Sequence, residues 1–432
     1  MLKRKIYQTL LYWKKTKTKE CLLVKGARQI GKTFIIERFG REQYGSYVYL
    51  NFFENPGLKA VFDDSLQANE IYKKISLFVN NVRFIERDTL IFLDEIQECP
   101  NARTALKFLA LDNKYDVIAS GSLLGLHYRE TASIPVGYEK TVEMHSLDFE
   151  EFLWAMGKTQ ASVLALRDYF DRLAKVDETV NDAFLRLIRE YMVIGGMPEA
   201  VNTFLKTNNF REVYDVQKKI TDSYREDVKH YASIPERQKI SDCYNSIPRQ
   251  LAKEYTKFQY KVVGKNGSAR RYGNSLNWLI DAGLVKMCVN VSAPLFPLVA
   301  YEKNEQFKIY LTDIGLLTCL YGFETQAALM KNTLKGPAKG GIYENLIFDI
   351  LTKRDIDLHY YKNDRNTMEI EFLYDRDGDV VPVEVKSNNV ATPSLNSFTI
   401  QFNPARAYKM IAGNLGVKDA KISLPFYMAL FI

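Results

Sequence analysis

Short apolar runs alternate with amphipathic segments over the first 147 residues of the chain. Four of these runs predict buried strands: "ECLLVKG" (20–26), "SYVYLNFFEN" (46–55), "TLIFLDEIQ" (89–97) and "YDVIASGS" (115–122). The segment "KTFIIERF", which begins at Lys32, carries its apolar residues on one face and predicts a helix. Strands that alternate with helices favour a three-layer α/β domain with a parallel sheet over residues 1–147.

Helical periods replace the strand pattern over residues 148–235. "LDFEEFLWAMG" opens with Asp148, a good N-cap residue. "YMVIGGMPEAV" interrupts a helix at Gly195 and Gly196, and Pro198 restarts it. We expect a helical lid beside the α/β domain, although a plain helical spacer would give the same pattern.

Two or three short helical segments and then a strand pair are predicted for residues 236–300. "WLIDAGLV" leads into the strand pair, and we expect Trp278, Leu279 and Leu284 to lie in the core. This order is typical of a winged helix-turn-helix domain. Such domains bind DNA in some proteins and dock protein partners or complete a lid in others, so both interpretations stay open.

The C-terminal segment, residues 301–432, combines a helix with a hairpin. "GGIYENLIFDILTKR" predicts a helix that carries Glu344. "TMEIEFLYDRDGDVVPVEVKS" predicts two strands joined at Asp377-Gly378, a dipeptide that favours tight hairpin turns. We expect an α/β domain here, separate from the three preceding segments.

Composition fits a packed protein of several domains. The chain has 432 residues, of which 47% are hydrophobic, and this length predicts about two to four domains. Its five cysteines, at 21, 99, 243, 288 and 319, are scattered without metal-ligand spacing, which favours reduced core thiols. No signal-peptide pattern and no uninterrupted apolar run of membrane length occurs in the sequence, so we expect a cytoplasmic protein.

The net charge of +7 is spread unevenly along the chain. Residues 1–20 hold seven Lys and Arg against one Glu, and the same ratio recurs between Arg249 and Arg271. Local basic concentrations fit a polyanionic partner such as nucleic acid, although both could be solvated helix faces. The residues of the second concentration that could follow phosphates are Lys253, Lys257, Lys261, Lys265, Arg270 and Arg271.

The stretch "GARQIGKT" (26–33) matches the phosphate-loop pattern G-x-x-x-x-G-K-[ST] between a predicted strand and a predicted helix. Its glycines let backbone N–H groups turn toward phosphate oxygens, and the new helix adds the positive end of its dipole. Lys32 would reach the β and γ phosphates of ATP, and the Thr33 hydroxyl would hold Mg²⁺. The predicted nucleotide-binding residues are Gly26, Ala27, Arg28, Gln29, Ile30, Gly31, Lys32, Thr33 and Phe34.

Two acids end the apolar run at residues 89–97, about sixty residues after the loop. Asp94 would bind Mg²⁺ through water, and Glu95 would act as general base toward the attacking water. Alone, the acids could equally belong to a helix N-terminus. Ser120 and Ser122 end the next strand and could orient the water or the γ-phosphate, with Ser122 as the tentative catalytic residue, or they could be turn residues.

A second set of candidate residues lies in the C-terminal segment. Glu384 and Lys386 in "VEVK" are two positions apart and share one face of a strand, which would also receive Glu371 from the other strand of the hairpin. With Glu344 from the helix, these residues could bind Mg²⁺ and position water for phosphodiester cleavage. Ion-paired strand faces have the same residue pattern, so this site is tentative.

Seven motifs in this order resemble those of prokaryotic AAA-superfamily ATPases that join a P-loop domain to a C-terminal restriction-endonuclease-like domain of the PD-(D/E)xK type. They are "GARQIGKT", "FLDEIQ", "SGSLLG", "LDFEEFLWAMG", "GGMPEAV", "YLTDIGLL" and "PVEVKS". The resemblance covers nearly the whole chain. It implies ATP binding by Gly31, Lys32 and Thr33, Mg²⁺ binding and hydrolysis at Asp94 and Glu95, and a nuclease-like fold at the C-terminus.

Two positions depart from that family's pattern. Tyr138 follows the glycine of "PVGYEK" where many relatives have arginine, and Glu371 stands where the nuclease-like pattern usually has aspartate. A glutamate can still ligate Mg²⁺, but its side chain is longer. Many such ATPases need a neighbouring copy to complete the site, and the arginines available for that role are Arg129, Arg189 and Arg225.

The leading functional hypothesis is an ATP-binding and ATP-hydrolysing switch that couples nucleotide state to the binding of nucleic acid or of a partner. One alternative is an ATP-dependent metal nuclease that uses Glu344, Glu371, Glu384 and Lys386. Another is a regulator whose C-terminal fold only holds a protein partner.

Overall fold

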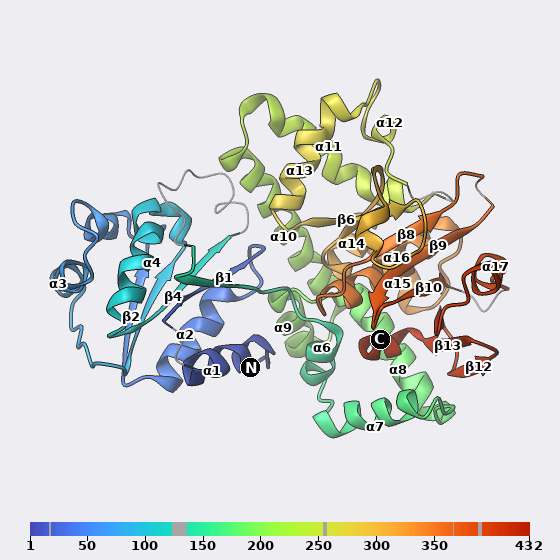
Figure 1. Cartoon of the computed structure of the whole chain (residues 1–432), viewed down its shortest axis with the longest axis horizontal. Coiled ribbons are helices and arrows are strands. Elements are labelled where there is room, and N and C mark those ends of the chain that lie inside the picture. Colours follow the sequence, from blue (N-terminus) through green and yellow to red (C-terminus); the bar gives the residue numbers. More distant parts are fainter. Residues whose placement is uncertain (17–18, 123–135, 254–256, 366, 388–390) are drawn as a thin grey trace. The chain divides into compact units, whose positions relative to one another are not determined.

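The structure, a computed structural model, describes residues 1–16, 19–122, 136–253, 257–365, 367–387 and 391–432 (Figure 1). The chain divides into two compact units. The N-terminal unit comprises Lys3–Ser146 with Asp281–Gly283, and the C-terminal unit comprises Met1–Leu2, Leu147–Ile280 and Leu284–Ile432. Both predicted boundaries beyond residue 147, at 235 and at 300, lie inside the C-terminal unit, so neither separates two compact units.

Strands and helices alternate along the N-terminal unit, as the sequence predicts. Its strands are β1 (Cys21–Gly26), β2 (Ser46–Asn51), β3 (Thr89–Asp94), β4 (Asp116–Ser122) and β5 (Glu139–Glu143). Its helices are α1 (Ile6–Thr16), α2 (Lys32–Gln43), α3 (Ala68–Phe78) and α4 (Pro100–Asp112), with the 3₁₀ turns η1 (Pro56–Phe62) and η2 (Ile96–Glu98).

The sheet of the N-terminal unit is parallel throughout the described residues, in the order β2-β3-β4-β1-β5. Every residue of β3 is buried, which confirms that the apolar run before Asp94 is a strand covered on both faces. Ile91 and Leu93 pack with α3 and α4 in one core cluster. The predicted parallel α/β sheet is therefore confirmed.

Helices dominate the first part of the C-terminal unit (Figure 1). They are α6 (Phe149–Ala155), α7 (Gln160–Asp171), α8 (Glu178–Ile194), α9 (Pro198–Thr207), α10 (Phe210–Tyr231), α11 (Ile234–Leu251), α12 (Tyr260–Val263) and α13 (Ala269–Asp281). Asp148 caps α6 in a reciprocal capping box with Glu151, Gly195 ends α8, and Pro198 begins α9. These three sequence predictions are confirmed.

A mixed sheet follows, with the order β12-β13-β11-β10-β9-β8-β6-β7 among the described residues. Its strands are β6 (Val285–Val291), β7 (Glu302–Leu311), β8 (His359–Lys362), β9 (Glu369–Arg376), β10 (Asp379–Lys386), β11 (Ala407–Ile411), β12 (Gly416–Lys418) and β13 (Lys421–Pro425). Its other elements are α14 (Ile314–Tyr321), α15 (Phe323–Met330), α16 (Pro337–Thr352), α17 (Pro393–Phe402), η3 (Leu298–Tyr301) and η4 (Phe426–Phe431).

The predicted hairpin is present as β9 and β10, which pair antiparallel with Val383 opposite Phe372. β6 pairs antiparallel with β7 and parallel with β8, so the strand pair assigned to a winged helix belongs to the same sheet as the hairpin. Trp278, Leu279 and Leu284 are buried, as predicted. The winged helix and the nuclease-like fold themselves stay predictions.

A buried polar network joins the helices of the C-terminal unit to one another. The Tyr191 hydroxyl donates to the Leu147 carbonyl at 2.9 Å and to Asp349 Oδ2 at 2.9 Å. Lys353 Nζ contacts the same two oxygens, at 3.2 and 3.1 Å. Gly196 N donates to Asp313 Oδ2 at 2.9 Å, and its carbonyl accepts from Leu147 N at 2.7 Å. A Cβ atom on Gly196 would lie 2.1 Å from the Leu147 oxygen, so only glycine fits there.

The cysteines agree with a further expectation. All five cysteines are buried free thiols, as predicted. Within the ranges that the structure describes, every helix is too short or too polar to cross a membrane.

Candidate nucleotide-binding site

The loop between β1 and α2 has the geometry of a phosphate cradle. Gly31 precedes α2 with a φ of 90°, a left-handed conformation that suits glycine. At the other end of the loop, a Cβ atom on Gly26 would lie 2.3 Å from the Met144 carbonyl oxygen, so glycine is required there too. Helix α2 begins directly after the loop, and its first N–H groups have no partner inside the helix. The loop can therefore bind an anion with backbone groups.

Lys32 lies across this loop and is nearly buried. Its Nζ donates to the carbonyl oxygens of Gly26 at 3.0 Å and Ala27 at 2.8 Å. Burial lowers the pKa of Lys32 to about 8, although the negative charges of Glu95 and Asp94 oppose that shift. A triphosphate would replace these two carbonyls with charged oxygens and would stabilise the ammonium form.

Asp94 is the centre of the hydrogen bonds at this site and is 1% exposed. Its Oδ2 accepts from Thr33 Oγ1 at 2.9 Å and from the Tyr49 hydroxyl at 3.0 Å. Its Oδ1 accepts from Ser120 Oγ and from Glu95 N, the latter at 3.1 Å. The structure thus brings together the two residues predicted to hold Mg²⁺, and a hydroxyl beside a carboxylate is an oxygen donor set that suits this ion.

Glu95 follows Asp94 in a left-handed conformation, with a φ of 52°. A residue other than glycine in this region carries backbone strain, which often accompanies functional sites. The Glu95 carboxylate accepts a hydrogen bond from the Gln97 side chain and is half-buried. It can accept a proton from water once that contact is released.

The predicted serines occupy different places at the end of β4. Ser120 bonds Asp94 directly. Ser122 pairs with Gly26 in the strand register, so it lies beside the first residue of the phosphate loop. Its role as a sensor of the γ-phosphate stays a prediction. Of the other predicted loop residues, Ile30 is buried and Phe34 is exposed on the first turn of α2.

Sequence reasoning missed three residues of this site. Tyr49 and Gln97 bond the two acids, and Arg4 donates to the carbonyl oxygens of Ile30 at 2.9 Å and His145 at 2.5 Å. Tyr49 could have been found from the strand register. Asn51 on β2 is paired with Asp94 on β3, and Tyr49, two positions before Asn51, points to the same face of the sheet as Asn51. Arg4 has no local motif that predicts its contact with a loop 26 positions away.

The four candidate nuclease residues gather on one side of the C-terminal sheet. Lys386 Nζ lies 2.8 Å from Glu371 Oε1 and 2.7 Å from Glu384 Oε1. Burial and the neighbouring Glu371 raise the pKa of Glu384 well above its usual range. Glu344 on α16 accepts hydrogen bonds from Lys308 and Tyr310.

Three further charged residues, in addition to the four candidates, belong to this cluster. They are Lys308 on β7, Lys362 on β8 and Glu369 on β9, and Glu369 bonds both lysines. Burial alone would lower the pKa of Lys308, but the charges of Glu344, Glu369 and Glu371 raise it above its ordinary value. Within the described residues, no three His, Cys, Asp or Glu side chains are arranged to hold a metal ion. Lysine ammonium groups lie between pairs of these carboxylates.

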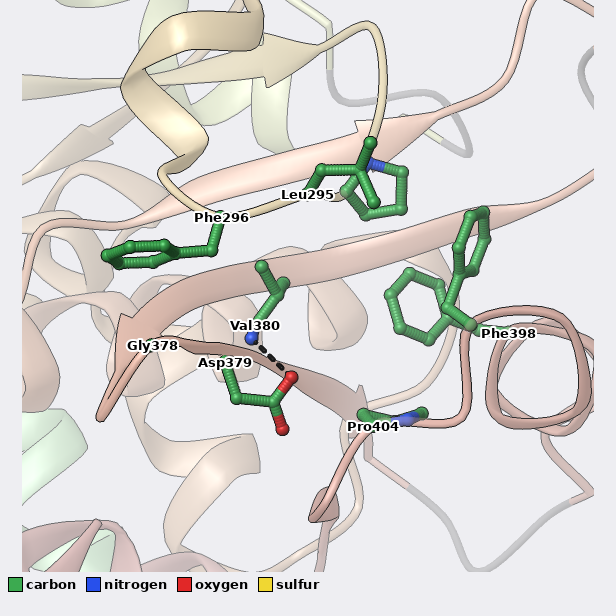
Figure 2. Close-up of a pocket in the computed structure, with 9 residues that line it drawn as sticks. Leu295, Phe296, Gly378, Asp379, Val380, Phe398 and Pro404 are labelled. Atoms are coloured by element: carbon green, nitrogen blue, oxygen red, sulfur yellow. Dashed lines mark hydrogen bonds between the residues drawn. The ribbon is translucent and has the colours of Figure 1, made fainter.

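A cavity of about 230 Å³ opens in another part of the C-terminal unit (Figure 2). Its lining is mostly apolar: Pro294, Leu295, Phe296, Gly378, Asp379, Val380, Phe398, Phe402 and Pro404. The carboxylate of Asp379 already accepts from Val380 N at 2.8 Å and Ala405 N at 2.8 Å. The cavity therefore has no evident catalytic group.

The predicted basic residues are mostly exposed around α12 and α13. Lys257, Lys261, Lys265, Arg270 and Arg271 are exposed, and Lys253 is half-buried with its Nζ 3.3 Å from Gln259 Oε1. Across the part of the chain that the structure describes, none of the six forms an ion pair with a carboxylate.

Of the three arginines that could complete the site of a neighbouring copy, Arg129 lies outside the described residues.

Family models match three segments of the chain. Residues 18–153 match an AAA domain, residues 185–327 match a domain of unknown function (DUF8612), and residues 339–427 match another domain of unknown function (DUF4143). The search of curated proteins found no match.

Solved structures resemble the chain only distantly. A Walker-type ATPase of Pyrococcus abyssi is 13% identical over 74% of this chain and 96% of its own, with a TM-score of 0.42. Cdc6p from Pyrobaculum aerophilum is 13% identical over 77% and 94%, with a TM-score of 0.27. AMPPCP-bound DnaA from Aquifex aeolicus is 14% identical over 64% and 88%, with a TM-score of 0.29. The match of residues 18–153 to an AAA domain agrees with the loop geometry and strand order of the described residues in that range, and together they support an AAA-type P-loop ATPase domain.

Proposed function

We propose that the protein is an ATP-hydrolysing switch that couples its nucleotide state to nucleic-acid binding. One observation carries the first half of the proposal. Lys32 and Thr33 at the start of α2 meet Asp94 and Glu95 at the end of β3, although the two pairs are far apart in sequence. This set supplies a cation for phosphate, oxygen donors for a metal and a carboxylate for water.

Lys32 takes part in the proposed binding step. Its ammonium leaves the carbonyl oxygens of Gly26 and Ala27 and contacts the β and γ phosphates, while the N–H groups of the loop face the same oxygens. Mg²⁺, held by Thr33 and Asp94, would neutralise charge that develops on the phosphates. Tyr49 and Ser120 keep the Asp94 carboxylate oriented.

Glu95 acts in the proposed hydrolytic step. Its carboxylate accepts a proton from the attacking water after the Gln97 side chain releases it. Ser122, beside Gly26 at the end of β4, would contact the γ-phosphate. Loss of that phosphate then removes ligands from Lys32 and from the loop.

Residues 144–148 connect the nucleotide site to the rest of the chain in this proposal. On one side, Met144 N donates to the Lys25 carbonyl at 2.8 Å, and Arg4 bonds both His145 and the phosphate loop. On the other side, Leu147 bonds Gly196, Tyr191 and Lys353. Since the two groups of contacts lie in different units and are joined through Ser146 and Leu147, this short segment is where we expect nucleotide exchange to be communicated.

The exposed basic residues around α12 and α13 support nucleic acid as the ligand. Five exposed cations without a described acidic partner are free to contact phosphates, and their binding would release counterions. Arg270 and Arg271 lie on the first turn of α13, the helix immediately before the β6–β7 pair. A recognition helix would occupy this position in a winged helix.

The proposal is tested by measuring ATP turnover and duplex DNA or RNA retention on the same preparation. We expect turnover by the wild-type protein and a retention that differs between the ATP and ADP states. Glu95→Gln should stay in its ATP state after ATP is added, so its retention should not change toward the ADP level with time as that of the wild-type protein does. If the protein turned over ATP but retained no nucleic acid, the proposed coupling to nucleic-acid binding would be wrong. That result would favour an ATPase that docks a protein partner.

A further inference from the structure

Lys308 lies at the centre of the charged cluster on the C-terminal sheet, at the point where carboxylates from a helix and a strand converge. Its side chain is 1% exposed. Its Nζ lies 2.8 Å from Glu344 Oε1 on α16 and 3.1 Å from Glu369 Oε1 on β9, and 4.9 Å from the centre of the Tyr360 ring. We propose that this ammonium is the resident cation of the cluster and takes the place that a divalent ion would need, so the cluster is not a metal site.

Each remaining carboxylate of the cluster also has a lysine contact, although among the described residues Glu384 Oε2 is buried without a hydrogen-bond partner. Glu369 Oε2 lies 3.0 Å from Lys362 Nζ. Glu371 and Glu384 share Lys386, and Glu371 Oε2 also accepts from Val385 N at 3.3 Å. Three lysines therefore face four glutamates, and every one of these glutamates has at least one lysine contact.

A divalent ion cannot join this arrangement without displacing a lysine. Mg²⁺ needs carboxylate oxygens at about 2.0–2.1 Å, and Mn²⁺ prefers similar oxygen ligands. An ion at that distance from Glu344 Oε1, on the side of Glu369, would lie against Lys308 Nζ, which is itself 2.8 Å from the oxygen. Two cations in contact repel strongly in a buried site, so only one of them can be present.

The same reasoning predicts what happens when Lys308 is removed. Glu344 and Glu369 lose a shared cation, and buried carboxylates without a partner are strongly unfavourable. Lys308→Met keeps most of the side-chain volume and leaves two convergent carboxylates. The variant should acquire an affinity for divalent cations that the wild-type cluster does not have.

The experiment is a Mn²⁺ titration of the full chain without nucleotide, followed by the electron paramagnetic resonance signal of free Mn²⁺. Every protein in this experiment carries Asp94→Asn, so that the phosphate-loop site does not bind Mn²⁺. The parent protein is the chain with Asp94→Asn alone. We expect Lys308→Met to bind Mn²⁺ at least about tenfold more tightly than its parent, and Lys308→Met with Glu344→Gln to lose that gain. Circular dichroism confirms folding, and if Lys308→Met is unstable, Mn²⁺ should raise its Tm more than that of the parent.

Two results would overturn the inference. The first is Mn²⁺ binding by the parent protein that disappears in Glu344→Gln or Glu384→Gln, because the cluster would then be a metal site as it stands. The second is a Lys308→Met protein that gains neither Mn²⁺ affinity nor a Mn²⁺-dependent rise in Tm. Neither result depends on whether the phosphate loop binds ATP.

Discussion

The Thr33 hydroxyl lies 2.9 Å from Asp94 Oδ2, although 61 positions separate the two residues in the chain. The parallel sheet explains this contact. β1 and β3 are separated in the sheet only by β4 and run in the same direction, so their carboxyl ends meet at one edge. Ligands bind outside the carboxyl ends of strands in open α/β sheets, and the acid and the hydroxyl are placed at that edge by topology.

Glu95→Gln should separate ATP binding from ATP hydrolysis. Glutamine has the same shape but cannot accept a proton from water, so we expect turnover to fall at least about 100-fold. Binding of a fluorescent ATP analogue should stay close to that of the wild-type protein.

The matched control is Glu37→Gln, which alters an exposed glutamate on α2 that pairs with Arg41 at 2.7 Å. It should leave both quantities unchanged. A Glu95→Gln protein that turns over ATP at the wild-type rate would show that another group activates the water.

The nucleotide site was predictable because its signals are local. The glycines, Lys32 and Thr33 form one short motif, and the acids end one fully apolar strand. Tyr49, Gln97 and Arg4 were missed because each acts through a hydrogen bond whose partner is chosen by the tertiary fold. Arg4 in particular depends on how the chain before α1 returns to the loop.

Arg4→Ala should weaken ATP binding without touching the nucleotide motif. The guanidinium bonds the Ile30 and His145 carbonyls and so fixes the phosphate loop to the end of β5. Hydrogen bonds to charged groups contribute about 1.5–3 kcal/mol each to stability. Since ATP binding can re-form part of the loop geometry, we expect about 1.4 kcal/mol of this to appear as lost affinity, on the order of tenfold. Lys3→Ala, an exposed neighbour, is the control for charge. Equal affinities for the two variants would argue against this positioning role.

Asp349 should make the stability of the C-terminal unit depend on pH. Burial raises the pKa of Asp349 from 3.8 to about 7, against the opposing effect of Lys353. Asp313 and the Tyr191 hydroxyl also face the carboxyl group. Between pH 3.8 and about pH 7, the Asp349 carboxyl group is protonated in the folded protein and ionised in the unfolded chain. The free energy of unfolding should therefore fall as pH rises from about 4 to about 7, by up to about 1.4 kcal/mol per pH unit.

Denaturant unfolding at several pH values measures this dependence. Asp349→Asn cannot titrate, so its stability should lack this contribution and change less over the window. Asp355→Asn, at an exposed position beyond α16, should keep the wild-type slope. If Asp349→Asn and the wild-type protein showed the same slope, Asp349 would be ionised throughout the window.

Arg270→Ala with Arg271→Ala should weaken retention of nucleic acid and make it less sensitive to salt. Each phosphate contact changes the slope of log K against log salt by about 0.9 for duplex DNA, so the slope should become shallower by up to about 2. Lys218→Ala with Lys219→Ala, two exposed lysines on α10, serve as the matched pair. If both double variants lost the same amount of nucleic-acid retention, the cause would be nonspecific electrostatic attraction rather than a binding site on α13.

The C-terminal sheet shows where sequence reasoning reaches its limit. The β9–β10 hairpin was predicted because Asp377-Gly378 marks the turn and alternation places Glu384 and Lys386 on one face. The parallel pairing of β6 with β8 was not predicted, because a long stretch of chain separates the two strands and no turn motif links them. For the same reason Lys308 escaped notice, since its partners come from α16 and β9.

Calorimetric titration of the folded protein with Mg·ATP, beside the Lys32→Ala variant, measures directly whether the phosphate loop binds the nucleotide. We expect saturable heat of binding for the wild-type protein and none for Lys32→Ala, with both proteins unfolding at similar temperatures. A well-folded wild-type protein that gives no heat at millimolar Mg·ATP, or a Lys32→Ala protein that binds as tightly as the wild type, would contradict this expectation.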